Sequence, residues 1–141
     1  MKHPILWLQD RPKLSWTLAF GYMAVIFVLS SFPYGPPQPT LLKPISATFK
    51  HFLEYSVLGF ILLACFRSSP KTRNRALLFA FLLAAFYGLT DEFHQLFVPG
   101  RTASFVDIAA DSLGAFAGAL ISKPSKGTKP AHKKLFKRSH L

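Results

Sequence analysis

The acidic residues of this sequence stand where carboxylates are costly to place. Of its six aspartates and glutamates, only Asp10 lies in an ordinary polar stretch. A charge at the centre of a membrane-spanning helix costs at least about 2.5–3.5 kcal/mol, so such residues are generally kept for chemistry or for pairing with one another. The sequence therefore indicates a functional site. The five acids in or against long apolar segments are Glu54, Asp91, Glu92, Asp107 and Asp111.

Helical spacing would place several polar groups on shared faces, because residues three or four apart are neighbours on a helix. Asp91, His94 and Gln95 have this spacing. A carboxylate beside an imidazole is suited to general acid–base chemistry. Three further sets follow the same rule: Lys50 with Glu54, His51 with Tyr55, and the stripe of Ser104, Asp107, Asp111, Gly114 and Gly118.

The position of each polar residue within its apolar segment divides the candidates for the functional site into two groups, catalytic and substrate-binding. A charge or imidazole without a function is costly deep in an apolar segment. Glu54 or Asp91 would act as a general acid or base, and His94 would carry protons. Arg101 could meet a phosphate or carboxylate of a substrate. The candidates for catalysis are Glu54, Asp91, His94 and Asp111. The candidates for substrate binding are Lys50, His51, Glu92, Gln95, Arg101 and Asp107.

Structural explanations compete with these assignments. Ser104 and Asp107 match a helix-capping pair, and Lys50 could pair with Glu54 for structural reasons alone. Arg101 could neutralise Asp107 or reach the outer headgroups. The remaining alternatives make His51 an interfacial residue, Glu92 a packing residue about 100° around the helix from Asp91, and Gln95 a hydrogen-bonding brace.

A divalent cation is a further option, because Asp91, His94, Asp107 and Asp111 would offer it oxygen and nitrogen ligands. No other cofactor is indicated. The sequence contains no H-E-x-x-H motif, and its single cysteine, Cys65, rules out a cysteine-based zinc site. It also lacks the G-x-S-x-G motif of serine nucleophiles.

Long apolar segments must position these residues. Half of the chain is hydrophobic, and four segments have roughly the 17–25 residues that a helix needs to cross the hydrocarbon core. We expect an all-α integral membrane bundle of four transmembrane helices, at 14–32, 48–66, 76–97 and 104–121. Residues 1–13 would precede this domain of residues 14–121, and residues 122–141 would form a basic, disordered tail.

The basic residues predict the orientation of the bundle. Of the 17 lysines and arginines, 14 lie in the N-terminal segment, the 67–75 loop and the tail, whereas the other side would carry only Lys43, Lys50 and Arg101. The positive-inside rule therefore places both termini in the cytoplasm. At 1.5 Å per residue, Glu54, Asp91, Asp107 and Asp111 would then lie roughly 4–10 Å below the outer helix ends. Three helices would thus carry carboxylates in one layer of the outer leaflet.

The net charge of +11 does not indicate nucleic-acid binding, because the basic residues are spread over termini and loops. Seven of them follow residue 122. We expect this tail to meet anionic lipid headgroups.

Two segments resemble the VanZ-like family of small bacterial membrane proteins. They are KHFLEYSVLG at residues 50–59 and TDEFHQLFVPGR at residues 90–101, and the pattern continues through Ser104, Asp107, Asp111 and Gly114. The resemblance covers roughly residues 14–121 and implies a multi-pass protein of the bacterial cytoplasmic membrane. The family takes its name from a protein associated with resistance to teicoplanin, so the resemblance points to the cell envelope and to glycopeptide susceptibility without defining a reaction.

Three functions remain open from the sequence. The first is an enzyme or modifier that acts at the outer leaflet on an envelope lipid or a lipid-linked precursor. The second is a non-enzymatic membrane protein that binds an envelope component or supports a partner complex, and the third is a small proton-coupled carrier. A homo-oligomer that associates through the face of Gly114 and Gly118 is a further expectation.

Overall fold

The computed structural model describes residues 4–33 and 45–122, and every regular element in these ranges is helical. This confirms the predicted all-α class. The predicted tail, from residue 123 onward, and residues 34–44 lie outside the described residues. The elements are α1 (Pro4–Gln9), α2 (Pro12–Ser30), α3 (Ile45–Ser68), the 3₁₀ turn η2 (Arg73–Arg75), α4 (Ala76–Gln95) and α5 (Phe105–Ile121).

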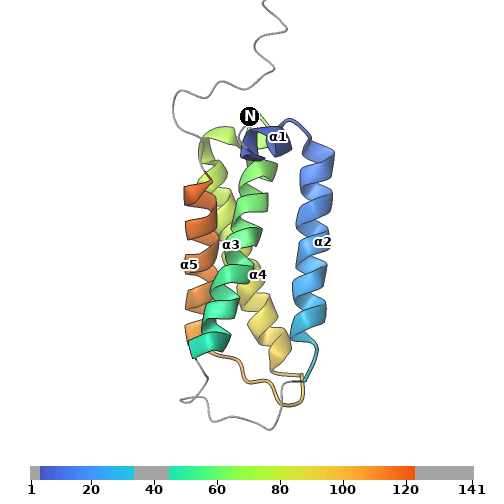
Figure 1. Ribbon diagram of the computed structural model, residues 1–141, viewed down its shortest axis with the longest axis vertical. Coiled ribbons are helices and arrows are strands. Elements are labelled where there is room, and N and C mark those ends of the chain that lie inside the picture. The colour runs from blue at the N-terminus through green and yellow to red at the C-terminus, as the bar shows by residue number, and fades with distance from the viewer. Residues whose placement is uncertain (1–3, 34–44, 123–141) are drawn as a thin grey trace, which may run out of the picture.

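The bundle is organised around α3, which packs against α1, α2, α4 and α5. Figure 1 shows α3 and α5 side by side and running in the same direction, with α2 and α4 running the opposite way. The start of α3, the end of α4 and the start of α5 therefore meet at one end of the bundle. The short α1 covers the other end, where Ile5, Leu6 and Leu8 are buried.

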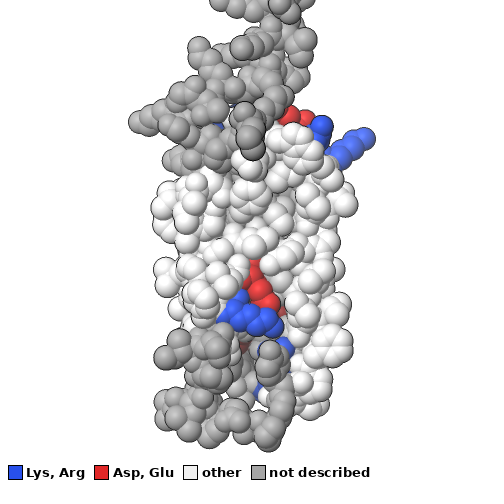
Figure 2. Space-filling view, in the orientation of Figure 1, with Lys and Arg blue, Asp and Glu red and all other residues white. Residues whose placement is uncertain are grey.

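The surface of the bundle is apolar, as expected for contact with lipid. Phe20, Phe86 and Phe97 are more than 60% exposed, and Figure 2 shows a band of uncharged side chains between charged groups near the two ends. Three helical segments are long and apolar enough to cross a membrane: Pro12–Ser30, Ala47–Ser68 and Arg73–Gln95. They correspond to the first three predicted spans.

The fourth predicted span forms α5, which has 17 residues. At 1.5 Å per residue it is about 25 Å long, somewhat less than the roughly 30 Å of a bilayer core. Its first half also carries two aspartates. Length and composition therefore identify three candidate membrane-spanning helices among the described residues, and the fourth span stays a prediction.

Glycines bring α3 and α5 into backbone contact. A Cβ atom on Gly114 would overlap the carbonyl oxygen of Phe52, and one on Gly118 would overlap that of Ser56. Only hydrogen at these positions permits such an approach, which is how small residues act at membrane helix interfaces. The predicted small-residue face thus packs inside the chain, against α3, and self-association through another face stays untested.

A tight turn joins α4 to α5. The backbone N–H of Arg101 donates to the carbonyl of Val98 over 3.0 Å, and Gly100 has a φ of 78°, in the left-handed region that glycine adopts without strain. Pro99 and Gly100 are typical residues of such a turn. Because it is short, it holds the acidic end of α4 beside the acidic start of α5.

Candidate functional site

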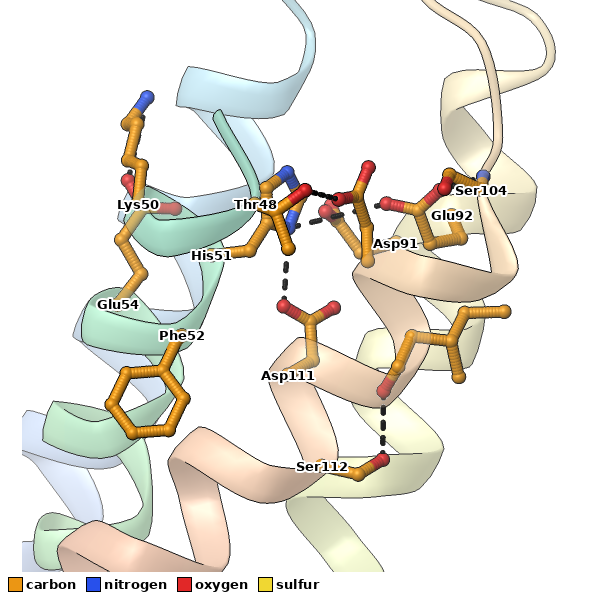
Figure 3. A network of polar contacts seen from close by, with 12 residues as sticks. Thr48, Lys50, His51, Phe52, Glu54, Asp91, Glu92, Ser104, Asp111 and Ser112 are labelled. Carbon is orange, nitrogen blue, oxygen red and sulfur yellow. Dashed lines mark hydrogen bonds and ion pairs between the residues drawn. The ribbon is translucent and has the colours of Figure 1, made fainter. Parts of the chain in front are cut away.

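Five ionisable side chains from three helices gather at the end of the bundle where α3 and α5 begin (Figure 3). Each is at most 8% exposed. Helix α3 runs antiparallel to α4 and parallel to α5. The start of α3, the end of α4 and the start of α5, which carry the five side chains, therefore lie at the same end of the bundle. The members of this polar cluster are His51 on α3, Asp91 and Glu92 on α4, and Asp107 and Asp111 on α5.

An imidazole lies between carboxylates from two helices at the centre of the polar cluster. The Nδ1 atom of His51 lies 3.1 Å from Oδ1 of Asp111, at hydrogen-bonding distance, and 4.0 Å from Oε1 of Glu92. The other carboxylate oxygen of Asp111, Oδ2, is buried without a hydrogen-bond partner. His51 can therefore exchange a proton with Asp111 inside the protein. The sequence makes His51 a candidate for substrate binding or an interfacial residue, and the structure places it at the centre of the polar cluster.

The carboxylates of Glu92 and Asp107 each accept a hydrogen bond from a neighbouring polar group. Glu92 Oε2 accepts a hydrogen bond of 2.7 Å from the backbone N–H of Ser104. Asp107 Oδ1 accepts one of 2.9 Å from the hydroxyl of Thr48 on α3. Ser104 occupies the N-cap position of α5, but its side chain makes no capping hydrogen bond. The capping hydrogen bond expected from the side chain of Ser104 is therefore not formed, although Asp107 does lie in the first turn of α5, where the helix dipole favours an acid.

Asp91 lies beside the cluster centre and is held within its own helix. The side-chain amide of Gln95 donates to Asp91 Oδ2 over 2.9 Å, one helical turn away. Asp91 Oδ1 and Gln95 Oε1 are both buried and have no hydrogen-bond partner. Gln95 thus orients Asp91, as the brace alternative predicted, while one oxygen of each group remains available to a ligand.

His94 faces away from the polar cluster. Its ring packs against Phe27 with 4.5 Å between the ring centroids, and its Nε2 lies 3.0 Å from the hydroxyl oxygen of Ser31. Both partners belong to the end of α2. Its spacing from Asp91 placed the two residues on one face, but about 60° of rotation around α4 is enough to direct His94 to a different helix.

Glu54 also points elsewhere. It forms an ion pair of 3.4 Å with Lys50 one turn earlier, with the two side chains 20% and 45% exposed. Figure 3 shows both side chains on the side of α3 opposite Asp111. A pair this exposed contributes little to stability. The structural alternative for Lys50 and Glu54 is therefore realised, and their proposed parts in substrate binding and catalysis stay predictions.

Arg101 connects the α4–α5 turn to the end of α2. Its Nη2 atom donates to the carbonyl of Leu29 over 2.9 Å, and its Nε atom donates to that of Phe32 over 3.1 Å. These carbonyls stand at the C-terminal end of α2, where a positive charge is favoured by the helix dipole. The substrate-binding role predicted for Arg101 remains untested, whereas its tethering of α2 is visible.

We expect Arg101→Met to lower the free energy of unfolding by about 1–2 kcal/mol, because two hydrogen bonds from a charged donor are lost at a partly exposed site. The midpoint of thermal unfolding of the detergent-solubilised protein would measure this. Lys71→Met is the control, since Lys71 is exposed at the other end of the bundle. Equal midpoints for the two variants would contradict the tethering role.

Sequence reasoning missed Thr48 on α3 and gave no role to Tyr55, although both residues belong to this site. Thr48 binds Asp107, as described above, and Tyr55 is fully buried with a hydroxyl that has no hydrogen-bond partner. Its nearest charged neighbours include Asp111 and Asp91. The spacing of Thr48, His51 and Tyr55 at i, i+3 and i+7 was the available signal, because these positions lie along one helical stripe.

The site defines a class of protein: a helical membrane protein with a buried carboxylate–imidazole cluster near one end of its bundle. The family described as VanZ/LLP1 matches residues 15–126. The chain therefore belongs to the VanZ/LLP1 family, which confirms the resemblance seen in its sequence. No curated protein and no solved structure matches the chain.

Proposed function

We propose that this protein spans the bacterial cytoplasmic membrane four times with both termini in the cytoplasm. The strong bias of lysine and arginine toward the N-terminal segment, the 67–75 loop and the tail supports this orientation. The antiparallel order of α2, α3 and α4, with α5 parallel to α3, is compatible with it. In this orientation the polar cluster lies in the outer leaflet.

The polar cluster would then act by general acid–base catalysis on an envelope lipid or a lipid-linked precursor. The observation that carries this proposal is the buried pair of His51 and Asp111, 3.1 Å apart and close to Glu92. An imidazole oriented by a carboxylate can take a proton from a substrate hydroxyl and return it to a leaving group. Asp111 would orient His51, and Glu92 would be the second acid or base.

The position of the cluster suits a substrate that arrives within the membrane. Its side chains are buried among α3, α4 and α5, and Lys50 lies at the same level on the opposite, exposed side of α3. A lysine at this level can attract the phosphate of a lipid headgroup. An effect on glycopeptide susceptibility would follow indirectly, through altered cell-wall precursors. The proton-carrier alternative has less support, because Asp, Glu and His side chains are buried only at this end among the described residues.

The test uses host cells that lack the protein and are complemented with the wild type, Asp111→Asn or Asp10→Asn. Asp10 is an exposed aspartate at the opposite end, so its amide variant is the matched control. We expect the deletion to change the profile of envelope lipids and lipid-linked precursors. The wild type and Asp10→Asn should restore it, whereas Asp111→Asn should not, at equal membrane levels. Teicoplanin susceptibility should follow the same order.

Two results would count against the proposal. Full restoration by Asp111→Asn would show that His51 does not need the carboxylate charge beside it, and would favour a binding or scaffold protein, because an amide keeps the shape of the side chain. Identical profiles for deletion and wild type would remove the envelope substrate altogether.

A further inference from the structure

We propose that the polar cluster binds one divalent transition-metal ion, of the Zn²⁺ or Mn²⁺ type, through His51, Glu92 and Asp107. One donor atom of each residue lies within 4.8 Å of the other two, and all three residues are buried. They come from three different helices. An ion at this point would join α3, α4 and α5 through one imidazole nitrogen and two carboxylate oxygens.

Unsatisfied polar groups next to these donors indicate that the protein alone does not complete the site. The hydroxyl of Tyr55 has no hydrogen-bond partner, although the residue is 0% exposed. Asp111 Oδ2 is likewise buried without a partner. The backbone of Gly88 lies against both groups, so that a Cβ there would come within 3.0 Å of this oxygen and 3.3 Å of the Tyr55 ring.

Buried polar groups normally find partners, because each one left unsatisfied is costly. The nearest charged groups of Tyr55 include Asp111, Asp91 and Glu92. Its hydroxyl therefore lies beside the cluster, and a metal-bound water or hydroxide could satisfy it. Helical spacing supports this placement, since Tyr55 follows His51 by one turn on the same face of α3.

The charge of the cluster favours a cation. Four carboxyl groups and one imidazole are buried together, and no lysine or arginine among the described residues is buried. Carboxylates that share a desolvated space repel one another and favour either protonation or a bound cation. A divalent ion would offset two of these charges at the point where the helices meet.

The donor types narrow the class of ion. Carboxylates alone would suit Mg²⁺ or Ca²⁺, whereas imidazole is a preferred ligand of zinc and other transition metals. The combination of one imidazole with carboxylates is therefore best matched by Zn²⁺ or Mn²⁺. With Nε2 as the atom that binds the ion, Asp111 would act as a positioning residue, because the hydrogen bond between Nδ1 and Asp111 would fix the orientation of the His51 ring.

This ligand set differs from the one expected from the sequence. That set included His94, which instead contacts the end of α2. Asp107 belongs to both sets. His51 and Glu92 are the new ligands, and Asp91 and Asp111 are not ligands in the proposed site. The inference concerns the site of the proposed function and rests on it in treating the cluster as a ligand site, although metal binding is measured without any substrate. With an ion bound, His51 and Glu92 would hold the ion, and a water molecule on that ion would take over the acid–base role assigned to these two residues above.

The experiment uses the full-length protein, purified with chelator and reconstituted in lipid nanodiscs. Zn²⁺ and Mn²⁺ binding is measured by equilibrium dialysis with elemental analysis, with Mg²⁺ as the comparison ion. We expect about one Zn²⁺ or Mn²⁺ per chain. The variants His51→Gln and Glu92→Gln should bind at least about tenfold more weakly, whereas Asp10→Asn should bind like the wild type.

A second measurement covers variants that fail to fold. In the Mn²⁺-loaded wild type, pulsed electron paramagnetic resonance should detect magnetic coupling to an imidazole nitrogen. Its absence, a preference for Mg²⁺, or wild-type affinity in folded His51→Gln would each overturn the proposal. If the purified protein binds metal but its deletion leaves the envelope profile unchanged, this inference stands and the proposed function fails. If the protein binds no metal but its deletion changes the envelope profile, the proposed function stands and this inference fails.

Discussion

Gly118→Leu should prevent the protein from folding, whereas Gly21→Leu should be tolerated. A side chain at position 118 would overlap the carbonyl oxygen of Ser56, which belongs to the α3 backbone and cannot rotate away. Overpacking of a core by added methylene groups costs about 1–3 kcal/mol, and we expect at least the upper value here because the helices themselves must separate. No atom lies within 4 Å of a Cβ on Gly21, which makes it the matched control.

Membrane-fraction yield and monodispersity in detergent would measure this effect. The two variants make the same chemical change within predicted spans, so any general cost of leucine cancels. A stable, monodisperse Gly118→Leu protein would show that α3 and α5 do not pack through their backbones. The arrangement of the polar cluster would then also be in doubt, because that contact sets the distance between His51 and Asp111.

The second large effect is expected at the pair of His51 and Asp111. His51→Leu removes the hydrogen-bond partner of a fully buried carboxylate. Breaking one side of a buried pair typically costs about 3–5 kcal/mol. Replacing both members by leucine removes the stranded charge, so the double variant should recover most of the lost stability while remaining inactive.

Thermal unfolding of the two single variants and the double variant gives the coupling free energy of the pair. Activity is read separately from the envelope profile of complemented cells. If the double variant were as unstable as the sum of the single variants, the two side chains would not interact. If it were active, neither group would take part in proton transfer.

Much of the fold follows from the sequence, because membrane helices are specified by length and apolar composition. The predicted spans match α2, α3, α4 and α5 to within a few residues at each end. The short α1 was not foreseen, since six residues carry too weak a periodic signal. Its apolar residues are buried by tertiary contact with the bundle, and local sequence does not report such contact.

The sequence predicted how far along each helix the polar residues of the candidate site lie. It did not predict the direction in which their side chains face. The 1.5 Å rise per residue places acids of three helices in one layer, and the structure brings Glu92, Asp107 and Asp111 together with His51. Rise alone does not reveal which way each helix faces. Glu54 and His94 therefore share the layer while they face Lys50 and α2. Thr48 was overlooked and Tyr55 was given no role, because an uncharged hydroxyl does not stand out in an apolar segment.

The hydrogen bond from position 104 to Glu92 comes from the main chain. Any amino acid except proline carries that donor. Because Ser104 is buried, alanine or another small residue at this position would keep the same contact. Sequence alignments would then show variation at a position where the structural contact is constant. An alanine substitution at this position would leave the hydrogen bond to Glu92 in place.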